Sequence, residues 1–230
     1  MRWLVTIVLA VIGGFAGAAA WNLSGWGGGA TRAYLLAHPE VLPEAIDRYQ
    51  SRQREARLAP VRDQLQTPFP GAVLGNPNGK VTLVEFSDYA CSYCRASVAD
   101  VQQLIAANPD LRVVVREYPI LRPESVDAAR MGLAAAQQGK FAAFHDAMYT
   151  LGPPSKQTIE RAARQAGVDL DQANQAIGSG MYDAFLKANI ALAGQLGMTG
   201  TPGWVVGDRI IDGAVGSAKL GGAIEEARRS

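Results

Sequence analysis

Cysteine is scarce in this chain: only two occur among its 230 residues, Cys91 and Cys94. A scaffold held together by disulfides needs more cysteines at wider spacing, so that class of protein is excluded. Histidine is equally scarce, and His38 and His145 lie far from each other and from the cysteines. Because a structural zinc site usually takes four ligands from two close pairs, we expect no metal site within one chain.

An excess of charge of either sign is also missing. The net charge is +1, from 22 basic and 21 acidic residues, and no block of like charge stands out. Proteins that bind nucleic acid usually carry a basic patch, so we expect no nucleic-acid partner. Apolar residues make up 48% of the chain, which is enough for a globular core. The length fits one domain with additions or two small domains.

The first 20 residues resemble an export signal in their composition. Arg2 precedes an apolar stretch that runs into small residues, and no charge occurs from Trp3 to Ala30. This order is typical of a secretory signal peptide that ends near Ala20. The alternatives are an uncleaved membrane anchor, since about 18 apolar residues just span a bilayer, and a buried N-terminal helix. Signal and anchor both place the cysteines in the periplasm or on the outer face of the cytoplasmic membrane.

Residues 21–66 are predicted to form a tether followed by a helical segment. Four glycines in Ser24–Ala30 indicate a flexible tether, and Thr31–Gln66 has a polar, helical pattern. A weak heptad runs through this segment, formed by Leu35, Leu42, Tyr49 and Ala56. It fits a helix packed on its own domain or an oligomerisation stalk. Interruptions at Pro39 and Pro43 favour a monomer.

Residues 67–230 are predicted to form an α/β domain, which begins near the Pro- and Gly-rich stretch Thr67–Lys80. The predicted strands are 81–86, 112–118, 204–206 and 210–211. The predicted helices are 90–108 and 217–229, with further helices throughout about 124–196. Strands that alternate with helices in this way indicate a sheet covered by helices.

The cysteine pair has the spacing C-x-x-C and follows a predicted strand at the start of a predicted helix. The free amides and the dipole at a helix start stabilise a thiolate at Cys91. Cys94, one turn further, can then attack a mixed disulfide formed at Cys91. Ser92 and Tyr93 lie between the sulfurs and are expected to tune the redox potential. The alternatives are half of a metal site or a plain stabilising disulfide, which gains little in so short a loop.

Two further features support thiol chemistry. Glu85 lies in the apolar strand before Cys91, where it either points to solvent or is a buried acid with a raised pKa that takes the proton of Cys94. Thr201-Pro202 precedes the strand at 204–206 and is either an ordinary trans turn or a cis-proline beside the cysteines. In the second case the Thr201 backbone can pair with an extended substrate peptide.

The segment VEFSDYACSYCR at 84–95, together with Gly200-Thr201-Pro202, resembles the DsbA family. The resemblance covers about Val81–Arg229. It implies a thioredoxin fold with an inserted helical domain at about 124–196. It also implies that Cys91 is the nucleophile and Cys94 the resolving thiol, with Glu85 as the buried acid and Thr201-Pro202 as the substrate-binding loop. Residues 34–45, YLLAHPEVLPEA, resemble ScsC-like members, some of which oligomerise and shuffle disulfides.

Three functions are consistent with these features. The first is an enzyme that introduces disulfides into exported proteins and is reoxidised by a membrane partner. The second is an oligomeric disulfide isomerase or reductase, and the third is a Cu(I)-binding or chaperone protein that uses the two soft thiols. No cofactor is expected. The expected partners are exported proteins with thiols or disulfides, a membrane redox partner and, for the second function, further copies of the chain.

Overall fold

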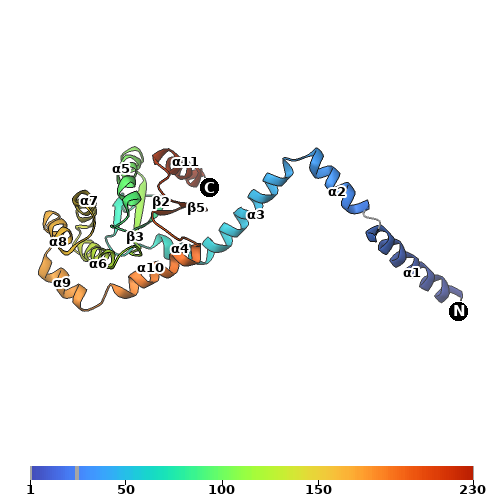
Figure 1. Cartoon of the computed structure of the whole chain (residues 1–230), viewed down its shortest axis with the longest axis horizontal. Helices are drawn as coiled ribbons and strands as arrows, with labels where there is room; N and C mark the ends of the chain where they lie inside the picture. The colour runs from blue at the N-terminus through green and yellow to red at the C-terminus, as the bar shows by residue number, and fades with distance from the viewer. Residues whose placement is uncertain (1, 24–25, 230) are drawn as a thin grey trace. The chain divides into compact units, whose positions relative to one another are not determined.

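The computed structural model describes residues 2–23 and 26–229. Its contacts divide the chain into two units, Met1–Arg52 and Gln53–Ser230. The N-terminal unit is helical, with α1 (Arg2–Leu23), α2 (Trp26–Ala37) and the first part of α3 (Val41–Leu58) (Figure 1). Within the described residues, no helix combines the length and the apolar character that crossing a membrane requires.

The prediction of a flexible tether is wrong for the part that the structure describes. Trp26–Ala30 forms the first turns of α2, while Ser24 and Gly25 lie outside the described residues. Alanine and leucine further along α2 are strong helix formers. Once one turn has formed, each added residue gains a hydrogen bond, so the helix extends back over its glycines.

The second unit is built around a five-stranded mixed sheet. Its strands are β1 (Val73–Gly75), β2 (Val81–Ser87), β3 (Leu111–Glu117), β4 (Gly203–Val206) and β5 (Arg209–Asp212), in the order β1-β3-β2-β4-β5. β2 and β3 are parallel, and the other pairs are antiparallel. The four predicted strands are confirmed. The sequence interpretation missed β1, which lies inside the predicted boundary stretch.

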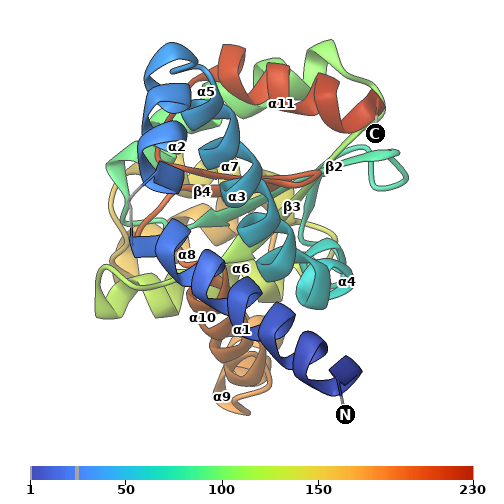
Figure 2. The same cartoon turned by 90° about the vertical axis from the view of Figure 1, so that its right-hand side faces the viewer.

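Side chains alternate between the two faces of the sheet, as the period of a strand requires. Leu83 and Val113 pack on one face with α5 (Ser92–Ala107) and α11 (Ser217–Arg229). Val84 and Val114 pack on the other face with α10 (Asp183–Leu196) and the segment around Leu65. Figures 1 and 2 show α5 and α11 on one side of the sheet and α10 on the opposite side.

The helices between β3 and β4 form the predicted insertion. They are α6 (Pro123–Gln137), α7 (Phe141–Leu151), α8 (Lys156–Gln165), α9 (Leu170–Gly178) and α10. Local signals set their ends: Pro123 starts α6, a Ser155–Thr158 capping box starts α8, and Gly197 in the left-handed conformation ends α10. The core of α6–α9 includes both cysteines, so the cysteine pair lies where the insertion meets the sheet domain.

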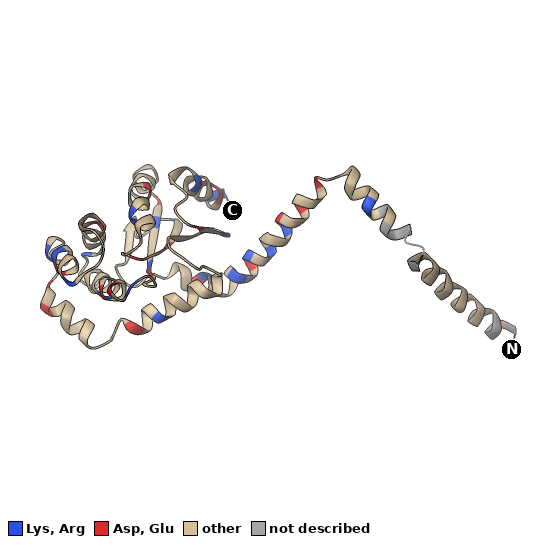
Figure 3. Ribbon diagram, viewed as in Figure 1, with Lys and Arg blue, Asp and Glu red and all other residues tan. Residues whose placement is uncertain are grey.

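The second unit begins earlier than the sequence indicated, at Gln53 instead of Thr67. The end of α3, a short 3-10 turn (Ala59–Val61) and α4 (Arg62–Gln66) bury Leu58, Val61 and Leu65 in the core. The predicted helical segment therefore contributes to both units. The ribbon in Figure 3 shows acidic and basic residues interspersed along α3, in keeping with its polar pattern.

Candidate active site

Cys91 and Cys94 occupy the predicted helix start. Cys91 is the N-cap of α5, and its Sγ accepts a hydrogen bond from the backbone amide of Cys94 at 3.4 Å. Both are free thiols; Cys91 is 5% exposed and Cys94 is fully buried. An amide that points at the Cys91 sulfur from the first turn favours negative charge on it. Ser92 and Tyr93 lie between them, and the Tyr93 side chain is exposed.

Asp88 holds the turn that carries Cys91, which the sequence interpretation missed. Its backbone carbonyl accepts from the amide of Cys91, and its Oδ1 accepts from the amide of Ala90. Its Oδ2 accepts from the amides of Ile120 and Leu121 at 2.9 Å each. One buried carboxyl group thus joins the active-site turn to the loop after β3. An aspartate directly after a strand is the signal that could have identified it.

The Thr201–Pro202 peptide bond is cis, as predicted, and lies against the cysteines. The thiol of Cys91 donates a hydrogen bond to the Thr201 carbonyl oxygen at 3.3 Å. Gly203, the next residue, begins β4 and pairs with Phe86 of β2. Pairing of β4 with β2 therefore brings residues 110 positions apart in the sequence into contact.

Glu85 is buried, with 3% of its surface exposed, so the alternative of a solvent-facing side chain is wrong. Its strand position places it on the face covered by α5, on the same side as Leu83. Burial raises its pKa from 4.5 to about 7. The pKa of the Cys94 thiol is also raised, first by burial and then by the charge of Glu85. The buried acid Glu85 and the buried thiol of Cys94 are therefore close enough at the start of α5 for the charge of one to affect the other.

A cluster of buried polar side chains surrounds Glu85. The Tyr89 hydroxyl donates to Glu117 Oε1 at 2.9 Å and lies 3.4 Å from His145 Nδ1. Burial raises the pKa of Glu117 and lowers that of His145 to about 4, which favours the neutral form of both. Tyr149 adds a second tyrosine hydroxyl, which lies 2.7 Å from the hydroxyl of Ser87. The sequence interpretation missed this cluster because its members come from segments far apart in the sequence: the loop after β2, the end of β3, and α7.

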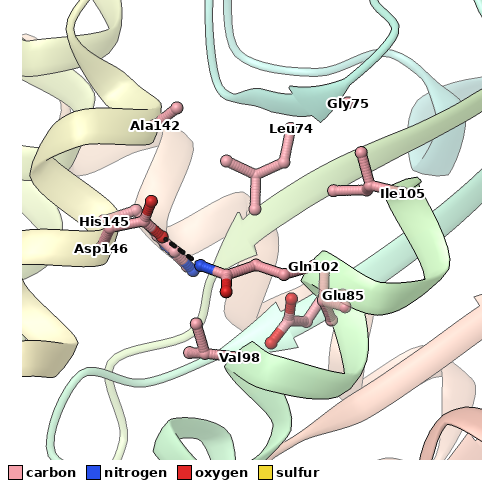
Figure 4. Close-up of a pocket in the computed structure, with 10 residues that line it drawn as sticks. Leu74, Gly75, Glu85, Val98, Gln102, Ile105, Ala142, His145 and Asp146 are labelled. Atoms are coloured by element: carbon pink, nitrogen blue, oxygen red, sulfur yellow. Dashed lines mark hydrogen bonds between the residues drawn. The ribbon is translucent and has the colours of Figure 1, made fainter.

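A cavity of about 140 Å³ reaches Glu85 from the side of α5 and α7. Figure 4 shows the Glu85 carboxyl group on its wall, with Val98 and Ile105 nearby. The Gln102 amide donates a hydrogen bond to Asp146 across the cavity at 3.4 Å. Polar groups line a space large enough for water. In the described parts of the chain, no group of three His, Cys, Asp or Glu could hold a metal ion.

The family described as Thioredoxin matches residues 69–226, and the family described as Copper resistance protein ScsC N-terminal domain matches residues 28–56. The first match covers more than half of the chain. The chain therefore belongs to the thioredoxin family.

Solved structures show which thioredoxin-fold proteins the chain resembles. A thioredoxin-like oxidoreductase from Silicibacter pomeroyi DSS-3 is 43% identical, with a TM-score of 0.70 over 74% of this chain and 98% of that one. The thiol-disulfide exchange protein alpha-DsbA2 from Wolbachia pipientis is 27% identical, with a TM-score of 0.70 over 77% and 97%. ScsC from Proteus mirabilis is 26% identical, with a TM-score of 0.68 over 86% and 93%. The chain is therefore similar over most of its length to thioredoxin-fold proteins of the DsbA and ScsC type.

Curated relatives include longer proteins. The Na(+)/H(+) antiporter NhaA of Herminiimonas arsenicoxydans is 28% identical over 183 residues, which cover 77% of this chain and 29% of that protein. NhaA 1 of Mycolicibacterium gilvum is 34% identical over 107 residues, which cover 45% of this chain and 17% of that protein. The chain spans less than a third of the length of these relatives, and the ion transport in their names belongs to the whole proteins.

Proposed function

We propose that this enzyme introduces disulfides into exported proteins by exchange through Cys91 and Cys94. The observation that carries the proposal is the setting of the Cys91 sulfur. It lies between the Cys94 amide, which favours a thiolate, and the Thr201 carbonyl, which accepts from the thiol. Both states of an exchanging sulfur thus have a partner, while Cys94 is buried behind it.

In the proposed reaction the oxidised enzyme carries a Cys91–Cys94 disulfide. A client thiolate attacks Cys91, a mixed disulfide forms, and Cys94 leaves with the electron pair and takes up a proton. A second client thiolate then attacks the client sulfur of the mixed disulfide, and Cys91 leaves as a thiolate. The client is oxidised by two electrons and the enzyme is reduced by two. A membrane redox partner would reverse the second change.

The other site residues support these steps. Glu85 is the proposed acid that supplies or takes the proton of Cys94, because a group with a pKa of about 7 can both give and take a proton near neutral pH. Thr201 and Pro202 form the proposed contact with an extended client beside Cys91. Ser92 and Tyr93 adjoin both sulfurs and are proposed to set the redox potential.

The proposed location is the periplasm or the outer face of the cytoplasmic membrane. It is supported by Arg2, the apolar stretch from Trp3 and the small residues that end at Ala20. An oxidising compartment also suits a disulfide donor. The experiment that tests the proposal is thiol trapping of Cys91 and Cys94 in growing cells. A donor is mainly oxidised there, whereas a reductase or isomerase is mainly reduced.

A specific observation favours a second candidate, an oligomeric disulfide isomerase. Residues 28–56 match the N-terminal domain of ScsC, and α3 exposes Leu42 and Ile46 four residues apart. Apolar side chains at this spacing share one face of a helix and are suited to packing against another copy. Several active sites around one client would raise their effective concentration. Refolding of a scrambled disulfide substrate tests this candidate.

A further inference from the structure

The cavity beside Glu85 has a buried floor and an exposed rim. Glu85 and His145 line the floor, where 3% and 2% of their surfaces are exposed. Gln102 of α5 and Asp146 of α7 line the rim, and both residues are exposed. The cavity therefore leads from the surface between α5 and α7 to a buried carboxyl group of the sheet domain.

Apolar side chains form the walls between the rim and the floor. Val98 and Ile105 of α5, Leu74 of β1 and Ala142 of α7 all line the cavity (Figure 4). With a volume of about 140 Å³, the cavity has room for several water molecules. Buried water needs about two to four polar partners, and the groups at the floor and the rim supply them. Water in this space would link the Glu85 carboxyl group to the surface.

A hydrogen bond spans the rim of the cavity. The side-chain amide of Gln102 donates to Asp146 Oδ1 at 3.4 Å, which joins α5 to α7 (Figure 4). A bond of this length is weak, and exposed side chains change rotamer rapidly. The pair can therefore cover the cavity and open it while both helices stay in place.

Glu85 is the lining residue that is suited to carry protons. Burial raises its pKa to about 7, so it changes protonation near neutral pH. His145 also lies on the floor, but burial lowers its pKa to about 4, so it stays neutral. Asp146 is engaged with Gln102 at the rim. A proton that crosses the cavity near neutral pH therefore begins or ends at Glu85.

We propose that Glu85 exchanges protons with solvent through this cavity, and that the Gln102–Asp146 pair is the gate at its rim. The inference rests on the proposed exchange function and deepens it, because that function moves one proton between Glu85 and Cys94 in each cycle. Glu85 must then recover its starting state, although its burial keeps it from direct contact with bulk solvent. The cavity connects this carboxyl group to the surface.

The protons balance in both directions of the exchange. When a client is oxidised, Cys94 leaves Cys91 with the electron pair and takes the proton of Glu85. The carboxylate then takes up a proton that enters from solvent through the cavity. When a client is reduced, Cys94 gives its proton to Glu85, its electron pair forms the bond to Cys91, and the client sulfur departs as a thiolate. Glu85 then releases its proton into the cavity.

Chemical rescue in the full chain tests this route. Glu85→Ala removes the carboxyl group and leaves a space that joins the cavity. In rapid mixing with a model disulfide peptide, we expect this variant to resolve the mixed disulfide about tenfold or more slowly at pH 7, because it lacks a positioned acid–base group. Formate is a small carboxylic acid that should enter from the rim, occupy the vacated space and restore most of the rate, with saturation at high concentration.

Three further substitutions, each added to Glu85→Ala, locate the route. Ala142→Phe fills the cavity from an exposed position on α7, so formate should no longer restore the rate. Ala143→Phe is the matched control, because Ala143 is the next residue of α7, is also exposed and does not line the cavity. Formate should rescue it fully. Gln102→Ala removes the gate, so half of the rescue should need several-fold less formate.

Rescue that persists with Ala142→Phe, or no rescue of Glu85→Ala at all, would overturn the cavity as the route. An unchanged formate requirement with Gln102→Ala would overturn the gate. If Glu85→Ala does not fold, Ala142→Phe alone decides: it should slow resolution in the otherwise wild-type chain, whereas Ala143→Phe should not. A Glu85→Ala enzyme as fast as the wild type would reject the acid role of Glu85 and the route with it. Failure of the wild type to form any mixed disulfide would instead reject the proposed exchange function.

Discussion

The thiol of Cys91 donates a hydrogen bond to the carbonyl oxygen of Thr201 at 3.3 Å. The same sulfur accepts a hydrogen bond from the Cys94 amide. The first bond needs the hydrogen of the thiol, and the second needs only a lone pair of the sulfur. Cys94 has no comparable opening to solvent, because it is fully buried. This asymmetry separates the proposed roles of the two sulfurs.

The asymmetry predicts opposite results for the two serine variants. Cys91→Ser should abolish disulfide exchange with a model peptide, because the sulfur that meets the client is gone. Cys94→Ser should still form mixed disulfides with clients and should accumulate them, because the resolving thiol is missing. Non-reducing gels and mass spectrometry of the trapped species measure both effects. Full turnover by Cys94→Ser with a dithiol substrate would show that the roles are assigned wrongly.

Burial of Glu85 predicts a stability that falls as the pH rises. The pKa of Glu85 is about 7 in the folded chain and 4.5 ordinarily. Between these values the unfolded chain binds fewer protons than the folded chain, so the free energy of unfolding decreases with pH and levels off above 7. The full effect is about 3 kcal/mol. Glu85→Gln cannot titrate, so its stability relative to the wild type should rise by about this amount over the same window.

Urea denaturation of both proteins at several pH values measures this difference. Taking the difference removes the contributions of the other titrating groups, which the two proteins share. Glu55→Gln, which changes an exposed side chain, is the matched control and should show no such trend. A constant difference between Glu85→Gln and the wild type from pH 4.5 to 8 would contradict a raised pKa.

Burial of His145 predicts the opposite trend, a stability that falls as the pH is lowered. Burial lowers the pKa of His145 to about 4, from an ordinary 6.5. Between these values the unfolded chain binds a proton that the folded chain does not, so stability is lost as the pH falls from 6.5 to 4. We expect this loss to be about 3 kcal/mol smaller in His145→Gln. Thermal unfolding across this range measures it, and His38→Gln, at an exposed histidine, should behave as the wild type.

The sequence was sufficient to predict most of the sheet. The runs at 81–86 and 112–118 are rich in apolar and β-branched residues, and a glycine or proline lies close to one end of each. Local preference and tertiary packing therefore agree there. β1 was missed because it has only three residues, Val73–Gly75, between prolines and glycines. It is a strand because it pairs with the edge of β3, and pairing between distant residues leaves no local pattern.

The same reasoning explains what was found at the site. The sequence holds a strong local signal for three features of the site. Cys91 belongs to a short motif, Glu85 is an acid in an apolar strand, and Thr201-Pro202 is a proline before a strand. No local signal marks Ser87 or Tyr149, because the hydrogen bond between their hydroxyls joins residues 62 positions apart. The start of the second unit was misplaced for a similar reason. Leu65 is held there by packing against the sheet, which a polar helical pattern does not reveal.

The hydrogen bonds of Arg116 are expected to hold residues 53–66, the start of the second unit, against the sheet. Arg116 is buried in β3, and its guanidinium donates to the backbone carbonyls of Gln64, Leu65 and Thr67 at the end of α4. Arg116→Met would leave buried carbonyl oxygens without donors, so we expect a loss of about 3 kcal/mol or more in the free energy of unfolding.

Urea denaturation measures this loss, and limited proteolysis should show faster cleavage within residues 53–66. Arg112→Met is the matched control, because Arg112 lies on the same strand and bonds only the Thr82 hydroxyl among the contacts described. Its cost should stay below about 1 kcal/mol. Equal effects of the two variants would mean that Arg116 does not hold the early segment.

The exposed face of α3 predicts self-association. Leu42 and Ile46 are 48% and 54% exposed, and burying both against another copy would remove apolar surface worth a few kcal/mol, about 1.5–3 for each side chain if burial were complete. We expect light scattering of residues 31–230 to show an oligomer and Ile46→Glu to yield a monomer, because a charge in an apolar contact is costly. Glu44→Gln is the control, since Glu44 pairs with Arg48 on the surface.

The exchange rate of Ile46→Glu with a small peptide should equal that of the wild type, because Cys91 and its partners all lie in the second unit. Refolding of a scrambled substrate then distinguishes the two candidate functions. A disulfide donor gains little from association, so its refolding activity should be low with or without the substitution. High activity that disappears with the oligomer would establish the isomerase instead. A monomer in both proteins would remove the structural basis for that candidate and leave the disulfide donor.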